Sequence, residues 1–153
     1  MRQIFDFTLH GFNSRFLCFL ASFLLPSAIL AAPSDHFVTT WKTVNPGTSN
    51  DTSITVPMIG GPYDVDWDND EIFDQIGVTG EVTHDYGLPG TYTIRIRGTY
   101  DSIRFGFSPD REKITSLDQW GTNVWTTMTR AFMQCSNLHI PATDIPNLSN
   151  VTS

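Results

Sequence analysis

The chain has 153 residues, with 9 Lys and Arg against 16 Asp and Glu, and a formal net charge of −7. Residues 1–32 hold two basic groups and one acidic group, so the remaining 121 residues carry 7 basic and 15 acidic groups. This excess of negative charge argues against a nucleic-acid partner, which needs a concentrated basic face, and against adsorption to anionic lipid. The length suits one domain of roughly 100 residues with a small appendage.

The N-terminal region predicts export. Residues 16–32 form an uncharged, mostly apolar run that follows Arg15 and ends in small residues, as in a secretory signal peptide. A membrane anchor is the alternative, but a span needs about 20 apolar residues, and this run has 17 with a proline inside it. We therefore expect residues 1–32 to be removed, leaving a secreted or cell-surface chain without a membrane span. Cys18 is lost with the signal, and Cys135 then has no cysteine with which to form an internal disulfide.

Short alternating stretches separated by turn residues follow the signal segment. In one of them a period of two places Tyr92, Ile94 and Ile96 on one face and Arg95 on the other. The stretches that read as strands are residues 36–42, 52–58, 63–67, 81–86, 91–97 and 102–107. Their spacing near ten residues predicts an antiparallel β-sandwich over residues 33–108.

The same periodicity separates expected core from expected surface. Trp67 is the largest core candidate, and we expect Trp67→Ala to cost roughly 3–5 kcal/mol. Asp66 and Asp68 are expected on the solvated side, so their replacement by alanine should cost far less. Tyr86, just before a Pro-Gly turn, is expected to place its ring in the core and to bond locally through its hydroxyl, as in a tyrosine corner.

Two segments of this region resemble landmarks of the PKD family. Residues 63–70 read Tyr-Asp-Val-Asp-Trp-Asp-Asn-Asp and are similar to the family's Trp-Asp-Phe-Gly-Asp-Gly segment, without its glycines. The second landmark, His-x-Tyr…Pro-Gly-x-Tyr-x-Val-x-Leu, is matched by His84, Tyr86, Pro89, Gly90, Tyr92, Ile94 and Ile96. The resemblance implies an immunoglobulin-like β-sandwich of an extracellular protein.

The period changes after residue 108. A polar connector leads to a short strand or turn over residues 114–121, and residues 124–135 then predict an amphipathic helix. The helical stripe consists of Val124, Met128, Ala131, Phe132 and Cys135, at offsets 0, 4, 7, 8 and 11.

This second region resembles the BspA-like leucine-rich repeats of bacterial surface proteins. The repeat positions are filled by Trp120, Val124, Met128, Ala131, Phe132, Cys135 and Leu138. The resemblance implies that residues 109–153 are a connector and the first, incomplete repeats. Asn150-Val151 restates Asn123-Val124 after 27 residues, so we expect the chain to be a fragment of a longer array. One repeat cannot bury its own apolar face, so the stripe of Met128, Phe132 and Leu138 either folds back on the sandwich or stays partly exposed. We expect weak packing and early amide exchange across residues 124–153, with residues 36–107 protected.

One acidic run is a candidate cation site. Asp64, Asp66, Asp68 and Asp70 match the first alternate positions of a calcium-binding loop, but Gln75 stands where such a loop has a bidentate Glu. The alternative is the solvated face of a strand followed by a polar turn. Calcium is therefore a weak candidate, and the sequence predicts no other cofactor.

Catalytic patterns are sparse. His36, His84 and His139 have no metal-ligand spacing, no nucleophile-elbow glycine pattern occurs, and Cys135 reads as a core position. We expect a non-enzymatic secreted or cell-surface protein that acts in adhesion or ligand binding, with an extracellular protein or glycan as partner and no nucleic acid. The alternatives are an accessory carbohydrate-binding or spacer module of a secreted hydrolase, and a small calcium-dependent structural module.

Overall fold

The computed structural model describes residues 35–106 and 110–152, all of which belong to one compact unit. The expected signal peptide, with Cys18, lies outside the described residues, as does Phe107. Regular secondary structure in the described ranges is entirely β, in antiparallel sheets. The predicted fold class is confirmed at this level, because the structure is mainly β and consistent with a sandwich. Within these ranges no helix is long and apolar enough to cross a membrane.

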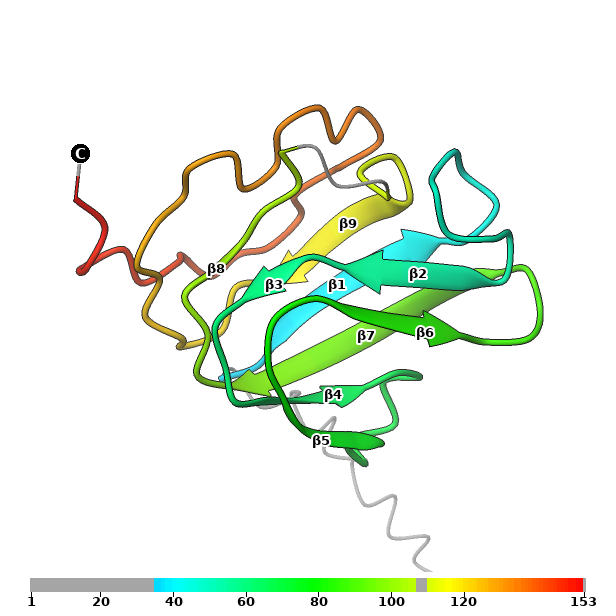
Figure 1. Cartoon of the computed structure of the whole chain (residues 1–153). Coiled ribbons are helices and arrows are strands. Elements are labelled where there is room, and N and C mark those ends of the chain that lie inside the picture. The colour runs from blue at the N-terminus through cyan, green and yellow to red at the C-terminus, as the bar shows by residue number, and fades with distance from the viewer. Residues whose placement is uncertain (1–34, 107–109, 153) are drawn as a thin grey trace, which may run out of the picture. The chain divides into compact units, whose positions relative to one another are not determined.

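The main sheet has five strands in the order β5-β4-β7-β1-β9 (Figure 1). Their bounds are β1 Phe37–Lys42, β4 Tyr63–Asp66, β5 Gln75–Val78, β7 Thr91–Gly98 and β9 Ile114–Gln119. The long β7 pairs with β1 from Phe37 opposite Ile96 to Lys42 opposite Thr91. Every strand pair in this sheet is antiparallel.

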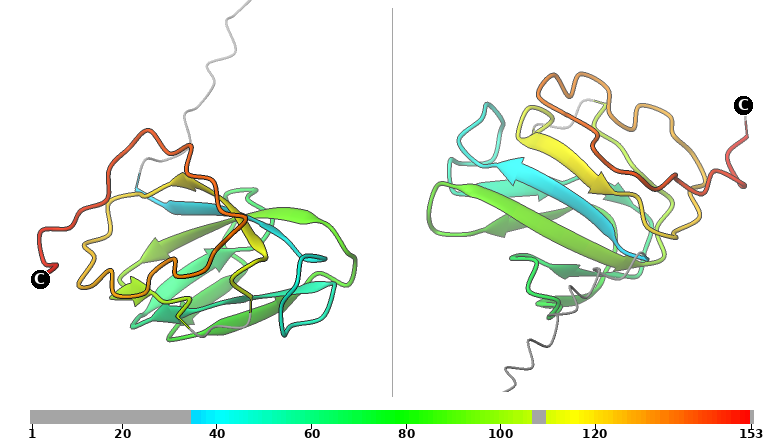
Figure 2. Two further views of the ribbon diagram at one scale, coloured as in Figure 1. Left: turned by 90° about the horizontal axis from the view of Figure 1, so that it is seen from above. Right: turned by 180° about the vertical axis from the view of Figure 1, so that it is seen from behind.

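Two short ladders form the opposite layer (Figure 2). β2 (Ser53–Val56) pairs with β6 (Val82–Asp85), and β3 (Met58–Ile59) pairs with β8 (Ser102–Ile103). Pro57 separates β2 from β3, which the sequence pattern joins into one strand. Proline lacks the N–H that a continuous ladder needs.

The core lies between the two layers and follows the predicted alternation. Ile94 and Ile96 of β7 are fully buried, and so is Val65 of β4. The buried apolar side chains also include Phe37, Trp41, Ile54, Val56, Tyr63, Trp67, Ile103, Phe105, Ile114 and Leu117. β-Branched and aromatic side chains stiffen an extended backbone and fill the space between sheets, so the same residues determine the strands and the core.

The described residues from β9 onward continue the main sheet. β9 pairs with β1 on one side, and its other edge receives the backbone of His139, whose carbonyl accepts the N–H of Leu117 at 2.9 Å. Ser116 and His139 form a parallel bridge, as do Val124 and Asn147. Each bridge joins residues 23 positions apart, so residues 137–147 run alongside residues 114–125 as a second coil of the chain.

The predicted helix over residues 124–135 is wrong. The chain forms consecutive turns there, and Arg130 (φ 57°) and Gln134 (φ 61°) adopt left-handed conformations that end any helical run. Phe105 and Gly106 also donate their N–H groups to carbonyls of this turn region at 3.3 Å. A tertiary contact therefore takes the carbonyls that a helix would use internally.

Most of the predicted apolar stripe nevertheless faces inward. Val124, its first member, is wrongly placed, because it is 38% exposed and the adjacent Trp125 is buried in its stead. Ala131 is buried, and Met128, Phe132, Cys135 and Leu138 are half-buried against the core. The segment is folded back on the sandwich, so the weak packing expected for residues 124–153 is wrong at the buried Trp125 and Ala131. Successive turns return a side chain to the same side every three or four residues, so the stripe survives without the helix.

Candidate binding site on the outer face of the main sheet

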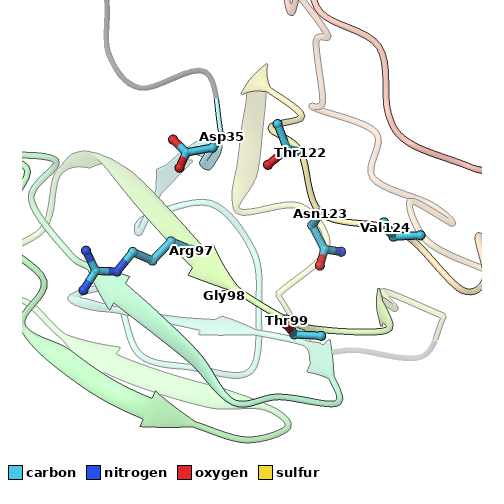
Figure 3. A pocket seen from close by; sticks show the side chains of 7 residues that line it. All are labelled: Asp35, Arg97, Gly98, Thr99, Thr122, Asn123 and Val124. Atoms are coloured by element: carbon cyan, nitrogen blue, oxygen red, sulfur yellow. The ribbon is translucent and has the colours of Figure 1, made fainter.

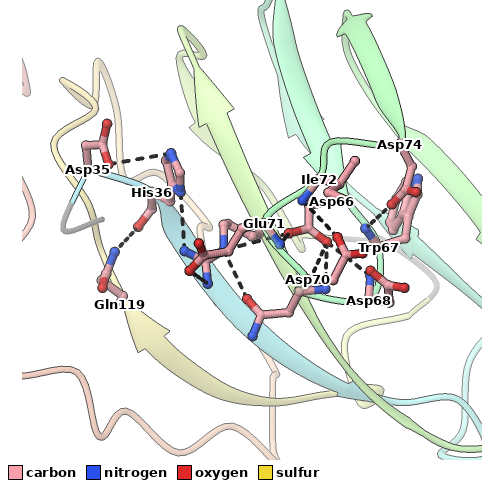
Figure 4. Close-up of polar contacts among 12 residues, drawn as sticks. Asp35, His36, Asp66, Trp67, Asp68, Asp70, Glu71, Ile72, Asp74 and Gln119 are labelled. Carbon is pink, nitrogen blue, oxygen red and sulfur yellow. Dashed lines mark hydrogen bonds and ion pairs between the residues drawn. The ribbon is translucent and has the colours of Figure 1, made fainter. Parts of the chain in front are cut away.

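The loop after β4 wraps around one buried carboxylate (Figure 4). Asp66 is 0% exposed, and its Oδ1 accepts the backbone N–H groups of Asp68, Asn69 and Asp70 at 3.3, 2.6 and 3.2 Å. Its Oδ2 accepts the N–H of Glu71 at 2.8 Å. Left-handed conformations at Asn69 and Glu71 turn successive N–H groups toward one anion. The expectation that Asp66 is solvated is therefore wrong, because the carboxylate points into its own loop.

Arg95 lies beneath this loop. It is on the outer side of β7, as predicted, but it is only 3% exposed. Its Nε donates to Oδ1 of Asn69 at 3.1 Å, and its guanidinium lies 3.8 Å from the Asp66 carboxylate and 3.9 Å from that of Glu71. The ring of His36 adds a contact at 3.4 Å. Charge attraction and hydrogen bonds thus hold the loop against the sheet.

Asp64 takes part in a separate surface pair. Nε of Arg97 donates to Asp64 at 2.9 Å, and the Arg97 guanidinium lies 3.8 Å from the ring centroid of Phe73. Partial desolvation raises the pKa of Asp64, but the Gly77 N–H and Arg97 outweigh it and lower the pKa overall. Asp64 is therefore held by an arginine, away from the other acidic residues of the run.

The structure regroups the calcium candidates. Asp66 and Asp68 lie with Asp74, their carboxylate oxygens within 4.8 Å of one another, whereas Asp64 and Asp70 are not in this group. Desolvation and then repulsion from Asp70 and Asp74 raise the pKa of Asp68. Asp74 was missed because only the path of the loop brings it back. Calcium binding stays a prediction, and the hydrogen bonds to Asp66 leave its oxygens little free capacity.

A polar groove lies next to the loop on the same face. Its volume is about 330 Å³, near the lower end of the range for small-molecule sites. It is lined by Val38, Thr40, Asn69, Thr93, Arg95, Asp118 and Gln119. These residues come from β1, β7, β9 and the loop, and no local sequence pattern brings them together.

A second hollow, of about 370 Å³, lies at the end of β7 (Figure 3). Asn123 lines it, but the Asn123 side chain is held by hydrogen bonds with the backbone of Tyr100. Arg97 extends away from Asn123 and toward its ion pair with Asp64. The polar groups of this hollow are thus largely occupied by the fold itself.

The two PKD-like segments meet in a stack of rings. Trp67 stacks on His84 with ring centroids 4.6 Å apart, and Tyr86 stacks on Tyr92 at 3.6 Å. Tyr86 donates its hydroxyl to the carbonyl of Trp67 at 3.0 Å. The local bond expected for Tyr86 is made instead by Tyr92, whose hydroxyl donates to the carbonyl of Leu88 at 2.9 Å.

Burial of His84 in this stack predicts acid destabilisation. Desolvation lowers the pKa of His84 below 6.5, although Asp74 and Asp85 partly oppose it. The folded protein binds the proton less well than the unfolded chain, so stability is fully present above pH 6.5 and falls as pH decreases below it. The melting temperature should therefore be lower at pH 5 than at pH 7.5, with a smaller difference in His84→Phe. An unchanged pH dependence in His84→Phe contradicts the assignment.

The remaining chemistry-bearing residues have structural surroundings. Burial raises the pKa of the Cys135 thiol to about 12, with a small opposing effect from Arg111. His139 lies at the edge of β9, on the side away from β1. No family model matches the chain, and no curated protein or solved structure was found that matches it. Its site is therefore defined by geometry alone.

Proposed function

We propose that this chain is a non-enzymatic protein of the cell surface or the extracellular space, acting in adhesion or ligand binding. In this proposal a PKD-like, immunoglobulin-like sandwich precedes the start of a BspA-like leucine-rich repeat array. The observation that carries it is the pair of parallel bridges, Ser116 with His139 and Val124 with Asn147. Both join coils offset by 23 residues, and not by the 27 residues that separate Asn123-Val124 from Asn150-Val151. An offset of 23 lies within the 20–29 residues typical of leucine-rich repeats.

The contacts around the second coil support stacking of this kind. Asp144 accepts the backbone N–H groups of Trp120 and Gly121 at 3.0 and 2.9 Å, and Trp125 donates its N–H to the carbonyl of Asn147 at 3.0 Å. In a solenoid each coil is held by its neighbour in this way. β9 then belongs to the sandwich through β1 and to the first coil through its opposite edge.

The strand pairing supports the immunoglobulin-like part. β2 pairs with β6 in one layer, and β4 pairs with β7 in the other. Immunoglobulin domains pair strand B with E and strand C with F in the same alternation between layers. The hydroxyl of Tyr92, near the start of β7, bonds back to Leu88, as a tyrosine corner does at the start of strand F.

The alternative role as a spacer module of a secreted hydrolase shares the sandwich. A spacer module does not require a second coil after the sandwich. The coil with its 23-residue offset therefore favours the surface-protein proposal.

Surface display is tested on the producing cells. An antibody against residues 35–152 should label intact cells or detect the protein in the medium, and N-terminal sequencing of the mature protein should begin near Ala32 or Pro33. The matched control is an antibody against a cytoplasmic protein, which should label permeabilised cells only. Labelling that requires permeabilisation, together with an intact Met1, contradicts the proposal.

A further inference from the structure

The groove beside the Asp66 loop is a shallow, open hollow on the sheet face. Val38 and Arg95 point to the outer side of the main sheet, where side chains of a two-layer protein normally meet solvent. They are only 7% and 3% exposed, and they line the groove together with Asn69 of the loop and Asp118 of β9. A hollow with a buried floor and several polar groups can hold part of a small ligand.

The polar groups of the groove are oriented in advance by one another. Thr40 donates its hydroxyl proton to Asp118 at 2.8 Å. Thr93 is therefore the donor in the 2.8 Å hydrogen bond between the hydroxyls of Thr93 and Thr40. The hydroxyl oxygen of Thr93 therefore keeps acceptor capacity. Ser116 holds the other oxygen of the Asp118 carboxylate at 2.6 Å.

Asn69 supplies the complementary donors. The Oδ1 atom of Asn69 accepts a hydrogen bond from Arg95. The NH₂ group of the same amide has no hydrogen-bond partner among the described residues, and Asn69 lines the groove. A ligand with adjacent hydroxyls can donate to Thr93 and Asp118 while accepting from Asn69. That pairing of donor and acceptor capacity is the chemistry of a vicinal diol.

The charges of the groove argue against an anionic ligand. The positive charge of Arg95 is opposed by Asp66 and Glu71, so no unpaired cation remains for a phosphate or carboxylate. The groove lies on the face of the sheet, whereas a peptide that adds a strand needs a free edge, and His139 occupies the edge of β9. Val38 offers an apolar surface for the C–H groups of a sugar ring.

We infer that this groove binds a neutral saccharide, with a vicinal diol held by Thr93, Asn69 and Asp118. The inference rests on the proposed function, because only an extracellular chain meets extracellular glycans. It deepens that function by naming a glycan, and not a protein, as the partner. A volume of about 330 Å³ accommodates a terminal sugar unit and part of the next. The groove contains no aromatic platform, so the affinity of a single site should be weak, in the millimolar range.

The inference is tested by titrating the mature, ¹⁵N-labelled chain with cellotetraose, mannotriose and chitotetraose, each to about 10 mM. At least one probe should shift the amide resonances of residues 38–40, 69, 93–95 and 118–119 in a saturable way. Thr93→Val should weaken that probe about three- to tenfold, as the loss of one hydrogen bond does. Shifts elsewhere on the chain, or none with any of the three probes, overturn the inference.

A matched control exists in the opposite layer. Thr55 and Thr83 form an equivalent cross-strand hydroxyl pair at 2.9 Å, so Thr83→Val should leave saccharide affinity unchanged. If Thr93→Val does not fold, the exposed Asp118→Asn serves instead, with the same expected weakening. Equal affinities of the groove and control variants overturn the inference. If the protein is found on the cell surface but binds no saccharide, this inference is wrong and the proposed function stands. If the protein is cytoplasmic but binds a saccharide in the groove, the proposed function is wrong and the saccharide site stands.

Discussion

Replacing Asp66 with alanine should lower the free energy of unfolding by about 3–5 kcal/mol, as the removal of one partner from a buried charged pair does. The side chain is 0% exposed, and its loss leaves four backbone N–H groups of the loop without their acceptor. It also leaves the buried Arg95 facing only Glu71 and the neutral partners Asn69 and His36. Urea unfolding followed by fluorescence measures the difference, since the loss of the loop also exposes Trp67.

Two companion variants separate charge from shape. Asp66→Asn keeps the size of the side chain but removes its charge, so it should fall between the wild type and Asp66→Ala. Asp68→Ala, on the exposed side of the same loop, should leave the unfolding curve nearly unchanged. If Asp66→Ala unfolds like Asp68→Ala, the carboxylate does not organise the loop.

Replacing Trp125 with alanine should also lower the free energy of unfolding by about 3–5 kcal/mol, as the truncation of a buried aromatic side chain does. Its ring is fully buried, with the rings of Phe37 and Tyr100 both 5.3 Å away and that of Trp120 at 5.9 Å. Because Phe37 belongs to β1, the cavity opens at the centre of the unit and not at its margin. Thermal unfolding should remain a single transition, moved to lower temperature.

The neighbouring residue provides the control. Val124 is 38% exposed, and Val124→Ala should change stability by less than about 0.5 kcal/mol. In the wild type, the Trp125 and His139 amides should exchange slowly, in contrast to the early exchange expected from the sequence, because they are hydrogen-bonded to backbone carbonyls. A separate, earlier transition in Trp125→Ala, or fast exchange at both amides, indicates that residues 120–152 are only loosely attached.

Strands whose side chains alternate between core and solvent were predictable from local pattern. The alternation in β7 correctly placed Ile94 and Ile96 inside, and the same reasoning located β1 and β4 to within a residue or two. β5 was missed, because a strand that carries Gly77 in a left-handed conformation and leaves most of its side chains exposed has little alternation to detect.

The errors in the second half have a shared cause. The spacing of Met128, Phe132 and Cys135 correctly predicted which side chains face the core, but that spacing is common to a helix and to a series of tight turns. The choice between them depended on Phe105 and Gly106, which donate to the carbonyls of the turn region. Contacts of this kind lie more than twenty residues away in the chain and leave no trace in a local period.

The candidate site was the least accessible to sequence reasoning. An acidic run signals charge, but not which carboxylate turns inward, so the pattern predicts a solvated Asp66 and gives no sign that Asp74 joins it. The groove is assembled from three strands and a loop, and its residues are ordinary in their own segments. Only the pairing of β7 with β1, and of β1 with β9, sets Thr93, Thr40 and Asp118 side by side.

By itself, the sequence determined the negative charge of the chain, its β character and the identity of most core residues. These follow from composition and from the two-residue period of an extended backbone, which are local properties. The tertiary structure alone decided which strands pair, that Asp66 and Arg95 are buried together, and that residues 137–147 lie along residues 114–125. Those outcomes depend on hydrogen bonds and burial between distant segments, whose energies are shared across the fold and are not encoded in any one stretch of residues.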